Sequence, residues 1–305
     1  MIRWKTRREC YSARMAIEMR PAHVVEITTP KKVKLYGLWY GPRRATRVIV
    51  IIHGLTGSMF SYVPRAFPTH LIDSRTAVLS FNNRGHGIVS RIHYGKRQLL
   101  AGSAHEIFRD SVDDIRGAVD FAKKNGARDI YIAGHSTGCQ KAVLYSSKLP
   151  TRARVKGLIL FGPVSDHAVA VRDDRHGRLS KAVGIARRLV RTGRPHEMMP
   201  RALRTKWSIN DAQRFLSLYT PDSAETIFSY EQPKKIPSAL HAIKIPQLIL
   251  WAKRDEYADR PAKEIAAWFE KHVRKGRIVI VPKVGHGFKG GERFVARQIK
   301  EFMKE

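Results

Sequence analysis

The feature that most constrains the fold is a repeated alternation of short apolar runs with longer amphipathic stretches. Runs such as "RVIVIIHG" (47–54) and "KGLILFGPVS" (156–165) consist largely of apolar residues. Strands that are buried on both faces have this composition, and amphipathic stretches between them are typical of the helices that cover such a sheet. We therefore predict an α/β fold with a mostly parallel central sheet flanked by helices.

The individual elements follow from this pattern. Residues 34–42 are expected to pair with the first strand as an antiparallel hairpin at the sheet edge. The expected strands are 23–29, 47–54, 76–85, 129–136, 156–165, 246–255 and 276–287. The expected helices, where apolar residues recur at helical spacing, include 104–126, 261–273 and 291–303.

The alternation is interrupted once, over residues 166–240. This segment contains no β-rich run, but it carries two amphipathic stretches and many basic residues. The pattern predicts a helical cap inserted between two strands. The expected organisation is therefore a basic, poorly structured leader over 1–22, a core formed by 23–165 and 241–305, and the cap at 166–240.

The N-terminal segment is basic and lacks the apolar stretch of roughly 7–15 residues that a secretory signal requires. A transit peptide, or a start at Met15 or Met19, remains an alternative. No run of about 18 apolar residues occurs, so no membrane span is expected. The two cysteines, Cys10 and Cys139, form neither a disulfide framework nor a metal-binding spacing, which favours a reducing compartment and a cytoplasmic protein.

The charge of the chain is strongly positive, with 57 basic and 26 acidic side chains and a net charge of +31. Such a balance often marks a protein that binds nucleic acid or another polyanion. Here the basic residues are spread from end to end, and the chain has neither zinc-finger spacing nor an aromatic RNA-binding motif. We therefore expect no specific nucleic-acid partner and interpret the charge as a general property of the surface.

The stretch "GHSTG" (134–138) places Ser136 between two glycines, directly after an expected strand and before an expected helix. In this setting Gly-x-Ser-x-Gly is typical of a sharp turn that presents a nucleophilic serine. The N-terminus of the following helix favours a negative charge that develops beside the hydroxyl. A plain glycine-rich turn is the alternative, and the strand and helix on either side favour the nucleophile.

A serine hydroxyl needs a general base, and the base needs a carboxylate that orients it. With this kind of turn the acid and then the histidine are expected later in the chain, each just after a strand. Asp255 and His286 occupy such positions, and glycines flank His286. We predict that they are the partners of Ser136, with Glu256 and Asp259 as alternative acids.

The negative oxygen of a tetrahedral intermediate needs N–H donors. One is expected from Thr137, which follows the serine, and the other from Leu55 in the loop "HGLTGS" (53–58). We interpret His53 as a brace for this loop. His135 is interpreted as a packing or hydrogen-bonding residue, because its place beside the serine points it elsewhere. The motif implies no cofactor and no metal ion.

Five segments together, "HGLTG", "NNRGHG" (82–87), "GHSTG", "RDEY" and "GHG", resemble the α/β-hydrolase superfamily in motif and in order. The resemblance covers the chain from about residue 23 to the end. It implies the α/β-hydrolase fold with a cap at residues 166–240. Within the superfamily the chain is similar to cap-bearing esterases, acylglycerol lipases and serine aminopeptidases, and "GHSTGCQ" also resembles siderophore ester hydrolases. Asn82 stands where an aspartate is commoner.

These observations predict a carboxylic ester hydrolase that forms an acyl-enzyme intermediate on a small-molecule ester. A peptidase, a thioesterase, an acyltransferase and a carbon–carbon bond hydrolase would use the same triad and remain alternatives. An aminopeptidase would need an acidic group for the substrate amine, such as Asp166, Asp173 or Asp174. A second hypothesis is that the basic cap recruits an anionic ester. A binding protein with this fold and without catalysis is the alternative from a different class.

Overall fold

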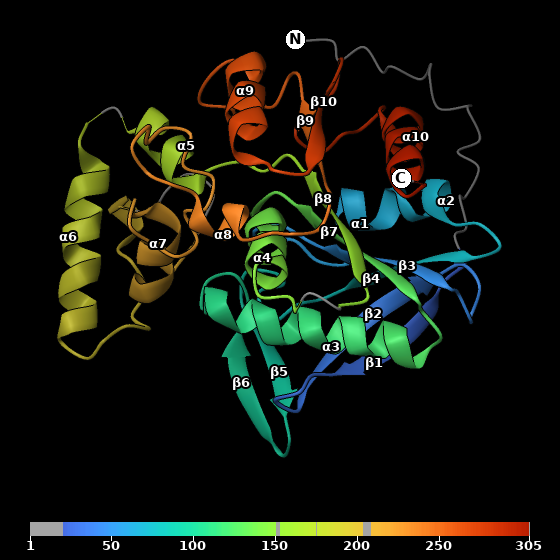
Figure 1. Cartoon of the computed structure of the whole chain (residues 1–305). Helices are drawn as coiled ribbons and strands as arrows, with labels where there is room; N and C mark the ends of the chain where they lie inside the picture. Colours follow the sequence, from blue (N-terminus) through green and yellow to red (C-terminus); the bar gives the residue numbers. More distant parts are fainter. Residues whose placement is uncertain (1–20, 151–152, 175, 204–208, 305) are drawn as a thin grey trace, which may run out of the picture.

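The computed structural model of the chain describes residues 21–150, 153–174, 176–203 and 209–304. A ten-stranded sheet runs through the molecule in the order β10-β9-β8-β7-β3-β4-β2-β5-β6, with β1 paired to β2 (Figure 1). The strands are β1 (His23–Thr28), β2 (Val33–Tyr40), β3 (Arg47–Ile52), β4 (Thr76–Phe81), β5 (Ser90–Tyr94), β6 (Arg97–Ala101), β7 (Asp129–His135), β8 (Val155–Phe161), β9 (Gln247–Ala252) and β10 (Gly276–Val281). The leader expected at 1–22 lies almost wholly outside the described residues.

Strands β4, β3, β7, β8, β9 and β10 run parallel to one another, whereas β2 pairs antiparallel with β4. The prediction of a mostly parallel sheet is thereby confirmed, as is the antiparallel pairing of β1 with β2. The hairpin of β5 and β6 was not expected. Its segments "SRIHY" and "RQLLA" are largely exposed, so they lack the continuous apolar run that reveals a buried strand.

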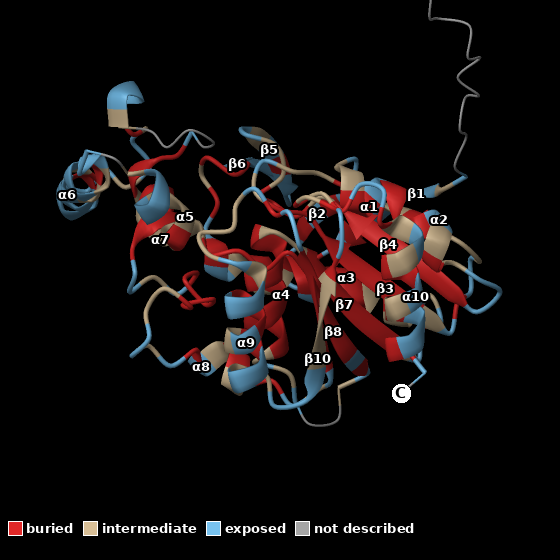
Figure 2. Ribbon diagram, turned by 90° about the horizontal axis from the view of Figure 1, so that it is seen from above, coloured by how far each residue is buried: buried red, intermediate tan, exposed pale blue. Residues whose placement is uncertain are grey.

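The central strands bury side chains on both faces, as Figure 2 shows for β3, β7 and β8. Along β3, Val48, Val50 and Ile52 contact one layer of helices, and the residues between them contact the other. A fully buried valine or isoleucine contributes about 1.5–3 kcal/mol. One layer contains α3 (Ser111–Lys124), α4 (Thr137–Ser146) and α9 (Ala262–His272), and the other contains α1 (Tyr62–Ala66), α2 (Pro68–Leu71) and α10 (Glu292–Phe302).

The helix expected over 104–126 begins later than predicted. A 3-10 turn spans Phe108–Asp110, and α3 starts at Ser111. Glu106 is instead drawn into the interior, where it forms an ion pair with Lys141 of α4. A buried charge without a partner costs more free energy than the loss of one turn at the end of a helix. The Glu106–Lys141 ion pair therefore determines the path of the chain before α3. Ile107, an apolar residue of the expected helix, is 47% exposed.

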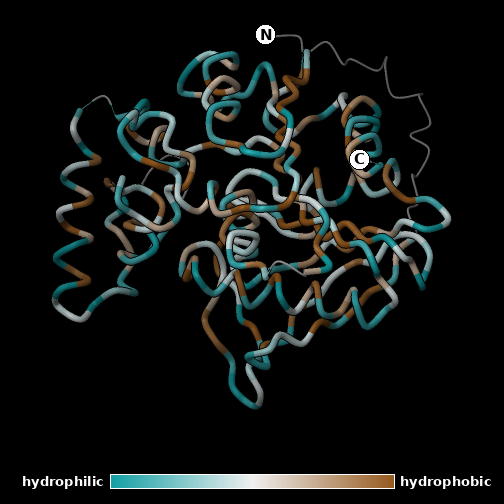
Figure 3. The backbone as a smooth tube through the Cα atoms, in the orientation of Figure 1, coloured by the Kyte–Doolittle hydropathy of each residue, from teal (hydrophilic) through white to brown (hydrophobic). Residues whose placement is uncertain are grey.

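Between β8 and β9 the described part of the chain adds no strand to the sheet. It forms α5 (Asp166–Asp173), α6 (Arg178–Arg191), η2 (Arg201–Leu203), α7 (Ala212–Tyr219) and α8 (Ser238–His241). Helices α6 and α7 lie to one side of the sheet (Figure 1) and share a small apolar cluster that includes Ala186 and Phe215. Hydrophobic and hydrophilic residues alternate along α6 (Figure 3), as expected for a helix with one buried side. None of the described helices combines the length and apolar character that a membrane crossing requires.

Candidate active site

Ser136 lies in a tight turn between β7 and α4. Its backbone has φ 55° and ψ −129°, a conformation that non-glycine residues rarely adopt. Such a residue costs on the order of 1–3 kcal/mol and persists only when its surroundings fix it. Here the N–H of Ser136 donates to the Phe161 carbonyl at 3.0 Å, and its own carbonyl accepts from the Cys139 N–H at 2.8 Å.

The two glycines of "GHSTG" are required by the close approach of backbone segments. A methyl group at Gly134 would lie 2.4 Å from the Gly138 oxygen. A methyl group at Gly138 would lie 2.4 Å from the oxygen of Ile52, at the end of β3. The turn can therefore pack between β7, α4 and β3 only if both positions lack a side chain.

Asp255 follows β9 and His286 follows β10, and the two side chains meet at the same edge of the sheet. Nδ1 of His286 donates to Oδ2 of Asp255 at 2.8 Å, and both residues are buried. The other carboxylate oxygen of Asp255 accepts from the Tyr257 N–H at 3.0 Å, which fixes its orientation. Nε2 of His286 is buried and has no hydrogen-bond partner among the described residues.

The two alternative acids have other contacts. Oε2 of Glu256 accepts from the backbone N–H of His286 at 2.9 Å, so this carboxylate holds the main chain and not the ring. Asp259 forms an ion pair with Arg260 at 2.8 Å. Asp255 is thus the acid that is hydrogen-bonded to the imidazole of His286.

His135 and His53 support the site without facing it as bases. Nε2 of His135 donates to the His286 carbonyl at 3.0 Å, and Nδ1 of His53 donates to the Gly54 carbonyl at 2.9 Å. Burial lowers the pKa of His135 to about 3, and the nearby His286 lowers it too. Burial also lowers the pKa of His53 to about 3, together with the charge of Lys141. Both imidazoles are therefore neutral at pH 7, in agreement with the roles inferred from the sequence.

The loop after β3 lies against the serine. A methyl group at Gly54 would be 2.7 Å from Cβ of Ser136 and 3.3 Å from its Oγ. Leu55, the next residue, lines the same cavity as Ser136, and Thr137 opens α4. The backbone N–H groups of Leu55 and Thr137 donate to no other described residue. Thr137 is fully buried and is not among the residues that line the cavity, and the role of both N–H groups as oxyanion donors stays a prediction.

A cavity of about 940 Å³ opens above this turn. Ser136 and His286 line its floor, and the segment 166–240 forms much of its wall. Residues of that wall include Asp166, Asp173, Asp174, Arg172, Arg178, Leu179, Phe215 and Tyr219. The three acids that the sequence suggested for binding an amine therefore lie at the cavity, together with two arginines.

Asp166 has an unusual environment on this wall. Burial, and after it the charge of Glu225, raises the pKa of Asp166 to about 7. Its carboxylate accepts a hydrogen bond from the neutral side-chain amide of Gln140 at 3.1 Å. The cavity thus contains a carboxyl group whose charge changes near neutral pH.

Sequence reasoning missed two residues beside the His286 ring. Tyr257 packs edge-on against the ring with 4.7 Å between the centroids. Gly162 follows β8, and a methyl group there would lie 3.1 Å from Cε1 and Nδ1 of His286. A glycine directly after a buried strand was a visible signal for Gly162, whereas the place of Tyr257 depends on how the loop after β9 turns.

Several solved structures share this architecture. The chain is similar to the siderophore hydrolase EstB of Aspergillus fumigatus, with a TM-score of 0.67 and 16% identity over 95% of this chain and 99% of that one. It is also similar to Est1E of Butyrivibrio proteoclasticus in a structure with ferulic acid, with a TM-score of 0.60 and 20% identity over 92% and 97%. It is similar as well to the esterase Pf2001 of Pyrococcus furiosus, with a TM-score of 0.58 and 18% identity over 93% of this chain and 91% of that one.

These likenesses, with the sheet order and the serine turn, show that the chain has the α/β-hydrolase fold, as the sequence motifs predicted. Residues 101–297 match the family described as "Protein of unknown function (DUF1749)", and the chain belongs to this family. A search among curated proteins finds no match to the chain.

Proposed function

We propose that this protein is a serine hydrolase that cleaves carboxylic esters of small molecules. The observation that carries the proposal is the hydrogen bond between His286 and Asp255, which leaves Nε2 of His286 unpartnered beside the cavity that Ser136 also lines. An imidazole held in this tautomer can accept the proton of a serine hydroxyl. The similarity in fold to the esterase Pf2001 and to the siderophore hydrolase EstB agrees with an ester substrate.

In the proposed mechanism Oγ of Ser136 attacks the ester carbonyl while Nε2 of His286 takes the hydroxyl proton. The imidazolium then gives this proton to the leaving alcohol, and the acyl group stays on Ser136. Water attacks the acyl-enzyme with His286 again as base, which releases the acid and restores the serine. Asp255 stabilises the imidazolium, and the N–H groups of Leu55 and Thr137 receive the oxyanion, each worth about 3 kcal/mol of barrier.

The proposal also assigns different roles to the core and to the cap. Residues 23–165 and 241–305 are the catalytic core of a cytoplasmic enzyme, and 166–240 is the cap that selects the substrate. Support comes from the cavity wall, to which α5, α6 and α7 contribute side chains.

An aminopeptidase is the second candidate, and Asp166 is the observation that favours it. The other two acids already have partners. Nε of Arg172 donates to Oδ1 of Asp173 at 2.8 Å, and Oδ1 of Asp174 accepts from the backbone N–H of Arg178 at 2.9 Å. Among the described residues, the one side chain that hydrogen-bonds to Asp166 is the neutral amide of Gln140, and Asp166 forms no ion pair with them, so a substrate ammonium group would be its cationic partner.

The test is to assay the wild type and Ser136→Ala on p-nitrophenyl esters of varied acyl length and charge, and on aminoacyl p-nitroanilides. We expect ester turnover to fall by about 10⁴-fold or more in Ser136→Ala, and labelling by a fluorophosphonate probe to disappear. Ser147→Ala is the control, because Ser147 lies at the far end of α4. Full ester turnover in Ser136→Ala would refute the proposal, and turnover of the anilides alone would favour the aminopeptidase.

A further inference from the structure

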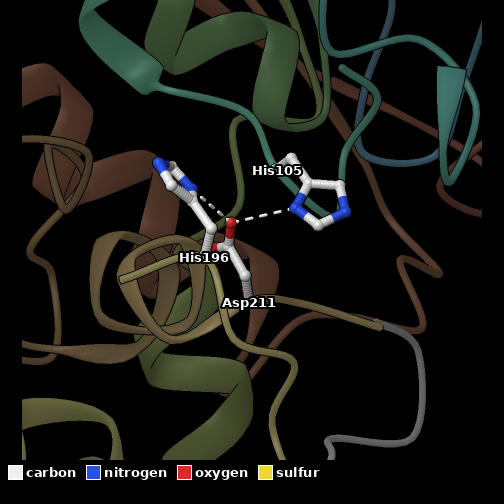
Figure 4. Close-up of side chains that lie close together, drawn as sticks. All are labelled: His105, His196 and Asp211. Carbon is white, nitrogen blue, oxygen red and sulfur yellow. Dashed lines mark hydrogen bonds and ion pairs between the residues drawn. The ribbon is translucent and has the colours of Figure 1, made fainter. Parts of the chain in front are cut away.

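Three side chains that are common metal ligands meet outside the cavity, where the segment 166–240 joins the core. His105 lies in the loop between β6 and α3, His196 follows α6, and Asp211 immediately precedes α7. Their ligand atoms all lie within 4.8 Å of one another. Figure 4 shows both imidazoles with Nδ1 directed at the carboxylate of Asp211. None of the three lines the cavity that contains Ser136.

The distances suit a coordinated ion. Nδ1 of His105 and Nδ1 of His196 each lie 3.0 Å from the same oxygen, Oδ2 of Asp211. In a tetrahedral zinc site with bonds of about 2.0–2.1 Å, neighbouring ligand atoms are about 3.3 Å apart. Small shifts of the two rings therefore make room for an ion between the three atoms. Each imidazole would carry its proton on Nε2, so that the Nδ1 lone pair faces the metal.

The surroundings fix two of the three ligands before any ion arrives. Asp211 is fully buried, and its other oxygen, Oδ1, accepts from the Arg214 N–H at 2.8 Å as the N-cap of α7. Its backbone N–H donates to the Ala104 carbonyl at 2.9 Å, next to His105. Oδ2 is thus directed at the two imidazoles. The His105 side chain is 10% exposed and the His196 side chain is 60% exposed, so the third ligand lies on the surface where an ion can enter.

We propose that His105, His196 and Asp211 bind one divalent transition-metal ion of the zinc type, with water at the remaining position. Two imidazole nitrogens and one carboxylate oxygen form a donor set that suits Zn²⁺ and its neighbours in the periodic table better than Ca²⁺ or Mg²⁺. Because His105 belongs to the core and the other two residues belong to the cap, the ion joins the two parts. It also steadies α7, whose Phe215 and Tyr219 line the cavity.

A second histidine pair provides a matched control. Nε2 of His241 and Nδ1 of His272 lie 2.9 Å apart, but neither forms an ion pair with a described carboxylate. This pair has two of the three donors of the proposed site and lies elsewhere, with His241 at the end of α8 and His272 at the end of α9. A chain that takes up zinc merely because it is rich in histidine would use both places alike.

The experiment uses the full-length chain without a histidine tag, treated with a chelator and then titrated with Zn²⁺ by calorimetry. We expect one equivalent to bind and the Tm to rise with zinc. Co²⁺ in place of Zn²⁺ should give the visible absorption of a four-coordinate site. These readouts do not depend on turnover, so they test the metal site separately from the proposed hydrolase.

Two variants test the assignment. His196→Ala removes an exposed ligand, and we expect it to raise the Kd for Zn²⁺ by at least about tenfold, since even loss of a group that only supports a ligand costs 10- to 100-fold. The rise in Tm should disappear with it. His241→Ala should bind like the wild type. The proposal is overturned if no stoichiometric binding occurs, if His196→Ala binds normally, or if His241→Ala abolishes binding.

Discussion

Gly162 illustrates how strongly the site depends on single residues. It lies at the end of β8 with φ +57°, where side chains are strained, and it faces the His286 ring. A methyl group would also lie 3.3 Å from Oδ2 of Asp255. The absence of a side chain here lets the imidazole and the carboxylate reach 2.8 Å from each other.

We expect Gly162→Ala to lower kcat/KM for esters by about 100-fold, the size of effect that a small misplacement of a catalytic group produces. The left-handed backbone should add a stability cost of about 1–2 kcal/mol. Gly95→Ala is the control, because Gly95 has a φ of +56° and no atom within 4 Å of the added carbon. Urea unfolding and ester assays measure the two effects. Equal activity of the two variants would show that Gly162 does not position His286.

For single residues, the sequence was informative where the position of a residue directly after a strand determines its place in the fold. Asp255 was inferred from its place after a strand, and it lies 2.8 Å from Nδ1 of His286. In a parallel sheet the C-terminal ends of the strands share one edge, so residues after different strands come together. Asp166 could be suggested from composition, but its raised pKa depends on burial near Glu225, which no local pattern reveals.

Among the elements, α7 is held to the core by buried charges. Glu106, in the loop before α3, pairs with Lys141 of α4 and lies 3.0 Å from Arg214 of α7. Arg214 also pairs with Glu225, which accepts a hydrogen bond from Ser217 at 2.7 Å. The side chains of Arg214 and Glu225 are at most 2% exposed. The network therefore links α4, the helix that follows Ser136, to α7.

We expect Arg214→Met to destabilise the protein by about 3–5 kcal/mol, because two buried carboxylates lose their shared cation. Arg116→Met is the matched control, since Arg116 forms an exposed ion pair with Asp120 at 3.0 Å, worth no more than about 0.5 kcal/mol. Urea denaturation of both variants measures the difference. Similar small losses in the two variants would mean that the network does not hold α7 in place.

The elements that escaped sequence prediction are those whose conformation depends on distant partners. The β5–β6 hairpin is largely exposed, and residues 33–34 of β2 pair with β5. The start of α3 is delayed because Glu106 turns inward to Lys141. The buried strands and the long helices were predictable, since their apolar periodicity does not depend on tertiary contacts.

For the molecule as a whole, four groups with shifted pKa values make stability depend on pH, two in one direction and two in the other. The folded pKa values of His53 and His135 are about 3, below those of free imidazoles, so the unfolded chain binds these protons first as the pH falls. Stability from them is present above pH 6.5 and is lost below it. Burial raises the pKa of Asp114 to about 6, against the opposing charge of Arg84, and that of Asp166 is about 7. As the pH falls, these two carboxyl groups bind protons in the folded state before they do so in the unfolded chain. Their contribution to the free energy of unfolding therefore increases as the pH falls.

Because the two effects oppose each other, we expect the free energy of unfolding of the wild type to change by only about 1 kcal/mol between pH 7 and pH 5. Substitution of one of the four groups should make the pH dependence of the other groups visible. His53→Asn should gain about 2 kcal/mol relative to the wild type over this interval as the pH falls, since one histidine accounts for 1.36 kcal/mol per pH unit below its normal pKa. Asp114→Asn should lose about 1 kcal/mol relative to the wild type over the same interval. Urea unfolding at pH 7, 6 and 5 measures all three proteins. The argument requires slopes of opposite sign for the two variants relative to the wild type, so parallel curves would contradict it.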